Sequence, residues 1–316
     1  MNIQKEGSFN YGLALLRAIM CFEVVLFHFW KTPVFFCLIP FSLLEGLAVP
    51  IFMFLSFYLT EKTIIGKNAE KKRNRILRIL YPQIGWTFIY WLIYVSIQTK
   101  FDLHVTFVDL AFQLFTGHSP VLNPSMWYQI VLFVLTITFF LIFKYFDEKR
   151  GVIFIFVMLL ISLFMQYSKI NFHLFGHLRY EIEYPLGRIF EMFPYAFLGF
   201  TCAYYKIFTR LEERNYLSII ILLLGTLFLL NFRIIPSALG FGYSHNNNLV
   251  LAFFIVGLFF LLPFEKLPVS LKNTIKFISK YTLGIYCSHR LIAFFVGLVG
   301  FVNVNSFSSC VIVYIT

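Results

Sequence analysis

Long apolar segments recur along the whole chain, and they constrain its fold more than any other feature of the sequence. Nine of them have about the 17–25 residues that a helix needs to cross the hydrocarbon core of a bilayer. They lie at residues 12–31, 41–60, 79–97, 127–145, 151–168, 188–206, 216–232, 248–264 and 280–300. A tenth apolar run, 301–316, is expected to be a short or truncated final helix. The sequence therefore predicts an all-α polytopic membrane protein with about ten transmembrane helices.

The composition agrees with this fold class. Hydrophobic residues make up 59% of the 316-residue chain and charged residues 13%, whereas soluble domains carry about 25% charged residues. The 43 phenylalanines would be hard to bury in one soluble core of this size. No soluble domain, clear repeat or low-complexity segment interrupts the pattern, so we expect a single membrane domain over residues 1–316.

The positions of lysine and arginine predict the orientation in the membrane. With a cytoplasmic N-terminus, 18 of the 26 fall in inner-side segments and six in outer-side segments. An excess of positive charge marks the cytoplasmic side of membrane proteins. We therefore expect a cytoplasmic N-terminus in a multi-pass protein of the plasma membrane. The net charge of +11 is then a topology signal rather than a nucleic-acid surface.

Arg17 and His28 are the most informative residues of the first apolar segment. They are eleven residues apart, which places them on one side of a helix, roughly 20° from alignment and about 16 Å apart along its axis. Ionisable residues inside a membrane span are costly and by default candidate functional groups. The alternative interpretation is a snorkelling arginine and a histidine that packs between helices. His28 suits proton transfer near neutral pH, because its ordinary pKa is about 6.5.

A basic segment, residues 71–78, precedes the third span. Such a run is either a topology determinant that binds anionic headgroups or a ligand site. Arg75 and Arg78 are three residues apart, so on a helix they form one guanidinium patch. Guanidinium groups match phosphate oxygens bidentately. This spacing suits a phosphate-rich soluble donor such as a coenzyme A thioester.

Three further residues are supporting candidates. His289 lies inside the ninth segment, where a histidine either bonds a neighbouring helix or takes part in chemistry. Glu23 shares a segment with His28 but lies on another face of the helix. Trp127 lies at the outer end of its span, where aromatic residues gather at the interface. The five cysteines have no metal-binding or redox spacing, and we expect no metal.

Several motifs resemble those of the acyltransferase family 3 membrane proteins, which O-acylate sugars of bacterial envelope polysaccharides. Residues 16–29 (LRAIMCFEVVLFHF) are similar to the family's opening L-R-G-x-A-x-x-x-V-x-x-x-H, and keep its Arg-x10-His spacing. The other matches follow in the family's order, namely residues 49–57 (VPIFMFLSF), 75–82 (RILRILYP), 126–128 (MWY) and 281–289 (YTLGIYCSH). Ala18 and Phe57 stand where the family pattern has glycine.

The resemblance implies roles for the residues already singled out. In that family the first-helix histidine is essential for transfer, its arginine supports it, and the R-x-x-R pair is associated with acyl-CoA. We therefore expect His28 and Arg17 to be catalytic, and Arg75 and Arg78 to bind acyl-CoA.

The function expected from these features is transfer of an acyl group from cytoplasmic acyl-CoA to a hydroxyl of a cell-envelope or exported polysaccharide sugar. Acetyl is the acyl group that we expect first. The main alternative is a transporter or polymerase of polysaccharide or lipid-linked sugar, which would not use acyl-CoA. A third is a non-catalytic membrane partner in an envelope assembly complex. The expected partners are acyl-CoA, a polysaccharide or lipid-linked glycan acceptor, and the lipid bilayer, with no nucleic acid.

Overall fold

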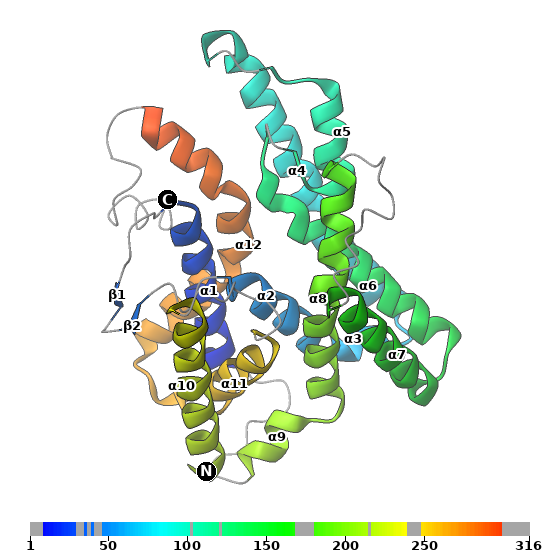
Figure 1. Cartoon of the computed structure of the whole chain (residues 1–316), viewed down its shortest axis with the longest axis vertical. Coiled ribbons are helices and arrows are strands. Elements are labelled where there is room, and N and C mark those ends of the chain that lie inside the picture. The colour runs from blue at the N-terminus through cyan, green and yellow to red at the C-terminus, as the bar shows by residue number, and fades with distance from the viewer. Residues whose placement is uncertain are drawn as a thin grey trace. The chain divides into compact units, whose positions relative to one another are not determined.

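The computed structural model describes residues 9–29, 35–36, 39–40, 46–101, 104–119, 122–167, 180–213, 216–238 and 248–298. These residues are almost entirely helical (Figure 1). The exception is a small antiparallel pair, β1 (Phe35–Phe36) with β2 (Ile39–Pro40). The chain divides into two compact units: unit 1 combines Met1–Tyr58 with Thr201–Thr316, and unit 2 is Leu59–Phe200.

Unit 1 is organised around its first helix. α1 packs against α12, and also against α2 and α11 (Figure 1). The apolar positions Leu16 and Met20 of α1 are completely or almost completely buried. The helical elements of this unit are α1 (Tyr11–Phe29), α2 (Ala48–Tyr58), α9 (Ile207–Glu212), α10 (Tyr216–Ala238), α11 (Asn248–Leu261), η5 (Phe264–Lys266) and α12 (Val269–Leu298).

Aromatic side chains fill much of the core of unit 1. Phe208 of α9 is completely buried, and its ring lies 5.4–6.2 Å from four other rings. Those rings belong to Phe54, Tyr58, Phe253 and Phe260. The high phenylalanine content therefore supplies interlocking rings between α2, α9 and α11, an arrangement that stabilises a core beyond its burial of area.

Unit 2 is built on two long helices, α4 and α6, which pack against each other. α5 packs on both of them, and α3 and α7 pack on α6. A capping box between Thr106 and Asp109 starts α5, and Gly117 ends it in the left-handed conformation, with φ 68°. The elements are α3 (Glu61–Ile65), α4 (Ala69–Phe101), α5 (Phe107–Thr116), η2 (Pro124–Met126), α6 (Trp127–Tyr145), α7 (Glu148–Tyr167) and α8 (Tyr180–Tyr204), the last of which continues into unit 1.

Each of the nine expected spans corresponds to a helix, but several boundaries differ. α4 begins at Ala69 rather than at residue 79, and α12 begins at Val269 rather than at 280. The charged residues that suggested loops there are good helix formers, so the helix continues through them. α2 has only 11 residues. It cannot extend back past Gly46, whose φ of 76° is not compatible with a right-handed helix. The expected final helix, 301–316, lies outside the described residues.

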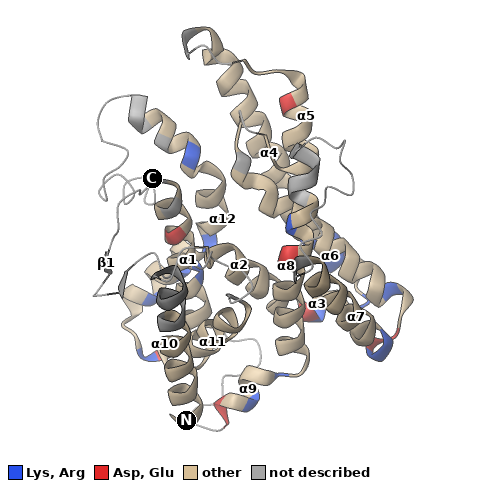
Figure 2. Ribbon diagram, in the orientation of Figure 1, with Lys and Arg blue, Asp and Glu red and all other residues tan. Residues whose placement is uncertain are grey.

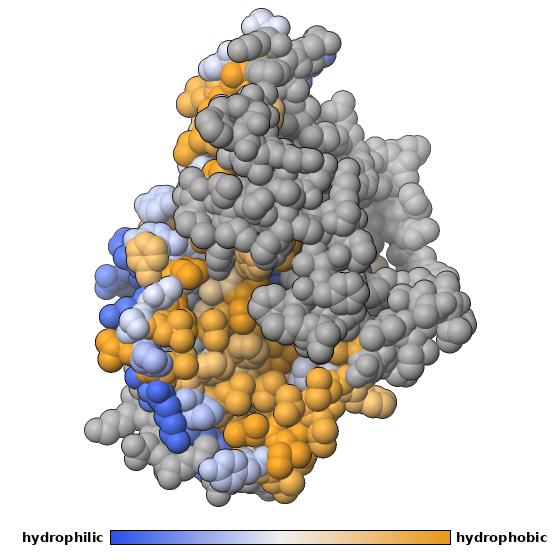
Figure 3. Space-filling view, turned by 90° about the vertical axis from the view of Figure 1, so that its left-hand side faces the viewer, coloured by the Kyte–Doolittle hydropathy of each residue, from blue (hydrophilic) through white to orange (hydrophobic). Residues whose placement is uncertain are grey.

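The outer surfaces of both units carry many large apolar side chains. Examples are Ile153, Phe156 and Phe164 on α7, and Ile220 and Phe228 on α10, all about half exposed or more. Figure 3 shows a broad area of hydrophobic residues on one face of the molecule, with hydrophilic residues along one margin. Exposed apolar surface of this extent is typical of a protein or membrane interaction surface.

Helix length and charge distribution point the same way. Two of the described helices, Ala69–Thr99 and Trp127–Tyr145, are long and apolar enough to cross a membrane. Many charged residues lie at helix ends, as at the turn between α6 and α7, whereas the middle parts of the helices carry few charged residues (Figure 2). Surface, length and charge together fit a membrane protein.

Candidate active site

Arg17 and His28 both contact α12, which agrees with their predicted position on one side of the first helix. Arg17 Nη2 donates a hydrogen bond to Thr282 Oγ1 at 3.3 Å. The Cys21 thiol, one turn further along α1, donates to the backbone oxygen of the same threonine at 3.3 Å. Two side chains of α1 thus bind α12 at Thr282. Arg17 is half-buried in this contact.

His28 meets two ionisable residues of α12. Its Nδ1 lies 3.0 Å from Arg290 Nη2. Its ring stacks on that of His289, with a centroid separation of 5.2 Å and an interplanar angle of 24°. We call His28, His289 and Arg290 the His–Arg cluster. It joins residues far apart in the sequence because α1 and α12 pack along one another (Figure 1).

One member of the His–Arg cluster, His289, is fixed by its own helix and buried. His289 Nδ1 donates to the backbone oxygen of Tyr286 at 2.7 Å, which fixes the imidazole against α12. His289 is completely buried, whereas His28 and Arg290 are half-buried. Away from water, a polar group such as the His289 imidazole acts more strongly on developing charge than it would in bulk solvent.

Glu23 makes a different contact from the other polar residues of α1. Its Oε1 accepts a hydrogen bond from the backbone N–H of Gly46 at 2.8 Å, and the carboxylate is buried. This bond anchors the turn that leads into α2. Glu23 therefore lies on another face of α1 from the contact with α12, as its helical angle predicted.

The expected acyl-CoA residues lie on the first turns of α4, in unit 2. Arg75 is half-buried and Arg78, one turn later, is exposed. Lys72, one turn before Arg75, places its ammonium 5.2 Å from the ring centroid of Phe140 on α6. A positively charged helix face with one half-buried and one exposed guanidinium can bind phosphate groups.

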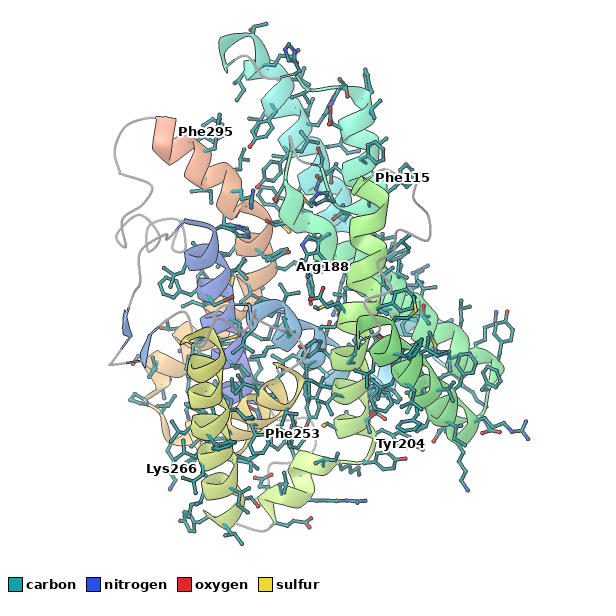
Figure 4. The ribbon with its side chains drawn as sticks, in the orientation of Figure 1. Phe115, Arg188, Tyr204, Phe253, Lys266 and Phe295 are labelled. Carbon is teal, nitrogen blue, oxygen red and sulfur yellow. The ribbon has the colours of Figure 1, made fainter. Side chains whose placement is uncertain are left out.

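Trp127, the remaining supporting candidate, begins α6 in unit 2. The guanidinium carbon of Arg188 lies 5.0 Å from its ring centroid, and Arg188 also forms an ion pair with Glu191 one turn further along α8. Figure 4 labels Arg188 on that helix. Trp127 is buried, so its indole ring stabilises a charged pair inside the unit.

Arg290 is the site residue to which sequence reasoning gave no role. The signal was present, because Arg290 is a second ionisable residue beside His289 inside an apolar segment. The sequence could not show that the Arg290 guanidinium lies within hydrogen-bond distance of His28 Nδ1 on α1. Among the described residues, no group of three His, Cys, Asp or Glu side chains is placed to hold a metal ion.

The fold and the site together define a helical membrane protein that holds paired imidazoles and a guanidinium between two of its helices. Comparison with protein families matches residues 10–316 to the acyltransferase domain of acyltransferase family 3. The chain therefore belongs to acyltransferase family 3, as its motifs indicated, and the activity of this membrane-bound family is acyl transfer. Comparisons with curated proteins and with solved structures give no match.

Proposed function

We propose that the protein is a multi-pass plasma-membrane O-acyltransferase with a cytoplasmic N-terminus. It transfers an acyl group, most simply acetyl, from cytoplasmic acyl-CoA to a hydroxyl of a cell-envelope or exported polysaccharide sugar. The observation that carries this proposal is the His–Arg cluster, in which His28 meets His289 and Arg290 between α1 and α12. The family to which the chain belongs supports the acyl transfer.

The chemistry of the cluster suits this reaction. Acyl transfer to a hydroxyl needs a group that takes the hydroxyl proton and a group that stabilises the charge on the acyl oxygen. Two imidazoles and a guanidinium can supply both. Arg17 lies on the same side of α1 as His28 and secures the contact with α12 through Thr282. We assign His28 and Arg17 to the catalytic site.

Donor binding is assigned to Arg75 and Arg78 on α4. Coenzyme A carries several phosphate groups, which guanidinium groups bind in a bidentate manner. The excess of lysine and arginine in the segments assigned to the cytoplasm, including 61–78, supports the same side for the donor.

The donor assignment is tested with a double variant, Arg75→Ala with Arg78→Ala. Binding of radiolabelled acetyl-CoA to the purified full-length protein should fall at least tenfold, because phosphate contacts are lost. Lysine at both positions should restore binding only in part, since it lacks the planar fork. The matched control is Lys149→Ala with Arg150→Ala, which removes two charges from another inner-side segment and should leave binding unchanged. Unchanged binding in the Arg75/Arg78 variant would show that the basic segment is only a topology signal.

A further inference from the structure

The partners of His28 fix which of its ring nitrogens carries the proton. Arg290 Nη2 lies 3.0 Å from His28 Nδ1. A guanidinium can only donate hydrogen bonds, so Nδ1 must accept, and the proton of the neutral imidazole is then on Nε2. His28 therefore offers an N–H donor from Nε2.

His289 has the opposite tautomer. Its Nδ1 lies 2.7 Å from the backbone oxygen of Tyr286, and a carbonyl oxygen can only accept. Nδ1 therefore carries the proton, and the lone pair of the neutral ring is on Nε2. This is the form in which an imidazole accepts a proton from a hydroxyl, because its other nitrogen is already held by an acceptor.

The two rings are close enough to act on one bound substrate. They stack with centroids 5.2 Å apart, one from α1 and one from α12. Arg290 follows His289 directly in α12. The guanidinium that bonds His28 and the second imidazole therefore belong to the same helix. A donor and an acceptor of protons thus stand side by side.

We propose that the stacked imidazoles divide the acid and base work of acyl transfer, and that Arg290 is the positioning residue that fixes this division. These roles rest on the function proposed above. His289 Nε2 takes the proton of the acceptor hydroxyl, whose oxygen bonds to the acyl carbonyl carbon. His28 Nε2–H donates to the carbonyl oxygen, on which negative charge develops. The carbon–sulfur bond then breaks, and the coenzyme A thiolate leaves with the proton that His289 held.

This division differs from the expectation from sequence, in which His28 is itself the base. With Arg290 on Nδ1, the neutral His28 ring has no second lone pair to offer a hydroxyl. The loss of a guanidinium at position 290 would release Nδ1 and let the His28 proton move between its two nitrogens.

Nitrogen NMR of the full-length protein, labelled with ¹⁵N-histidine and reconstituted in lipid bilayers, tests the tautomers directly. The signals are assigned from His28→Gln and His289→Gln samples. We expect His28 to show a protonated Nε2 with a bare Nδ1, and His289 to show the reverse. In Arg290→Met the His28 signals should change, while Arg290→Lys, which still donates, should keep the wild-type pattern. A protonated Nδ1 on His28 in the wild-type protein would overturn the proposal.

Rates of acetyl transfer from radiolabelled acetyl-CoA to membrane glycans provide the second readout. His289→Gln should lower the rate by about 10²–10⁴-fold, the usual effect of losing a positioned base. His28→Gln keeps an N–H donor and should lose less activity than His28→Ala. Arg290→Lys should retain more than Arg290→Met, and His104→Gln, an exposed histidine before α5, should match the wild type. A near-normal rate in His289→Gln with an inactive His28→Gln would make His28 the base and contradict the assigned roles.

The two measurements separate this proposal from the function on which it rests. If the wild-type protein transfers no acetyl from acetyl-CoA, the proposed function fails, whereas the NMR pattern still decides the tautomers. If the wild-type protein is active and the NMR pattern is reversed, the function stands and the division of roles fails.

Discussion

The His28 side chain of α1 contacts two ionisable residues of α12. Arg290 holds one of its ring nitrogens, and His289 covers one face of the ring. A hydrogen bond from His28 to a neighbouring helix is also what the packing alternative predicts. The variants below distinguish a chemical role of His28 from a purely structural one.

On the proposed function, replacing His28 by alanine should remove most of the transfer activity while the protein still inserts. We expect the rate of acetyl transfer in isolated membranes to fall by about 10²–10³-fold, the usual effect of losing a group that stabilises the charge on the acyl oxygen. Expression and detergent-extracted yield should stay near the wild-type level. His104→Ala is the matched control, since His104 is exposed and outside the cluster. A His28→Ala variant that keeps most of its rate would support a non-catalytic role in an assembly complex.

How much of the site follows from sequence differs from residue to residue. Helical geometry alone placed Arg17 and His28 on one side of α1 and Glu23 on another. The contact between Arg290 and His28 could not be predicted, because it joins residues 262 positions apart and no local periodicity encodes such a pairing. The roles of Arg75 and Arg78 remain predictions.

At the scale of the elements, the contact between α1 and α11 depends on a small residue. A Cβ at Gly12 would lie 1.8 Å from the backbone oxygen of Phe259, so no side chain fits there unless the helices separate. Gly284 of α12 differs, since outside the neighbouring backbone of its own helix no atom lies within 4 Å of the position that its Cβ would take. One glycine is needed for close packing and the other is not.

The two glycines give a matched pair of substitutions. Gly12→Ala should lower the midpoint of thermal unfolding of the detergent-solubilised protein, because overpacking of this kind typically costs about 1–3 kcal/mol. Gly284→Ala should leave the midpoint unchanged or raise it slightly, since alanine favours a helix over glycine by about 1 kcal/mol. Equal midpoints for Gly12→Ala and the wild type would show that α1 and α11 are not packed as described.

The existence of the helices was predictable, but some of their ends were not. Long apolar segments predicted α1, α4, α6 and α12, because an apolar segment of this length forms a helix when it crosses the hydrocarbon core of a bilayer. The basic residues at the start of α4 and α12 were assigned to loops by their charge, although Lys, Glu and Arg favour helices. Charge predicts where a helix leaves the membrane and does not predict where it ends.

At the scale of the whole molecule, the proposed mechanism depends on orientation. Glu70, before the basic segment of α4, should be cytoplasmic, and His104, before α5, should face outward. Both positions are exposed, so a cysteine placed at either one, in a chain cleared of its own cysteines, can react. A membrane-impermeant thiol reagent added to intact cells should label His104→Cys and miss Glu70→Cys. The reverse pattern would contradict a donor that binds at Arg75 and Arg78 from the cytoplasm.

The central claim is that the protein adds acyl groups to an envelope or exported glycan. Mass spectrometry of these glycans, from cells with the protein, without it and with His28→Ala, tests this claim most directly. We expect acetylated sugars only in cells with the wild-type protein, on glycans of otherwise unchanged length and abundance. Glycans that differ in amount or length but carry the same acyl groups with and without the protein would contradict the account and indicate a transporter or polymerase.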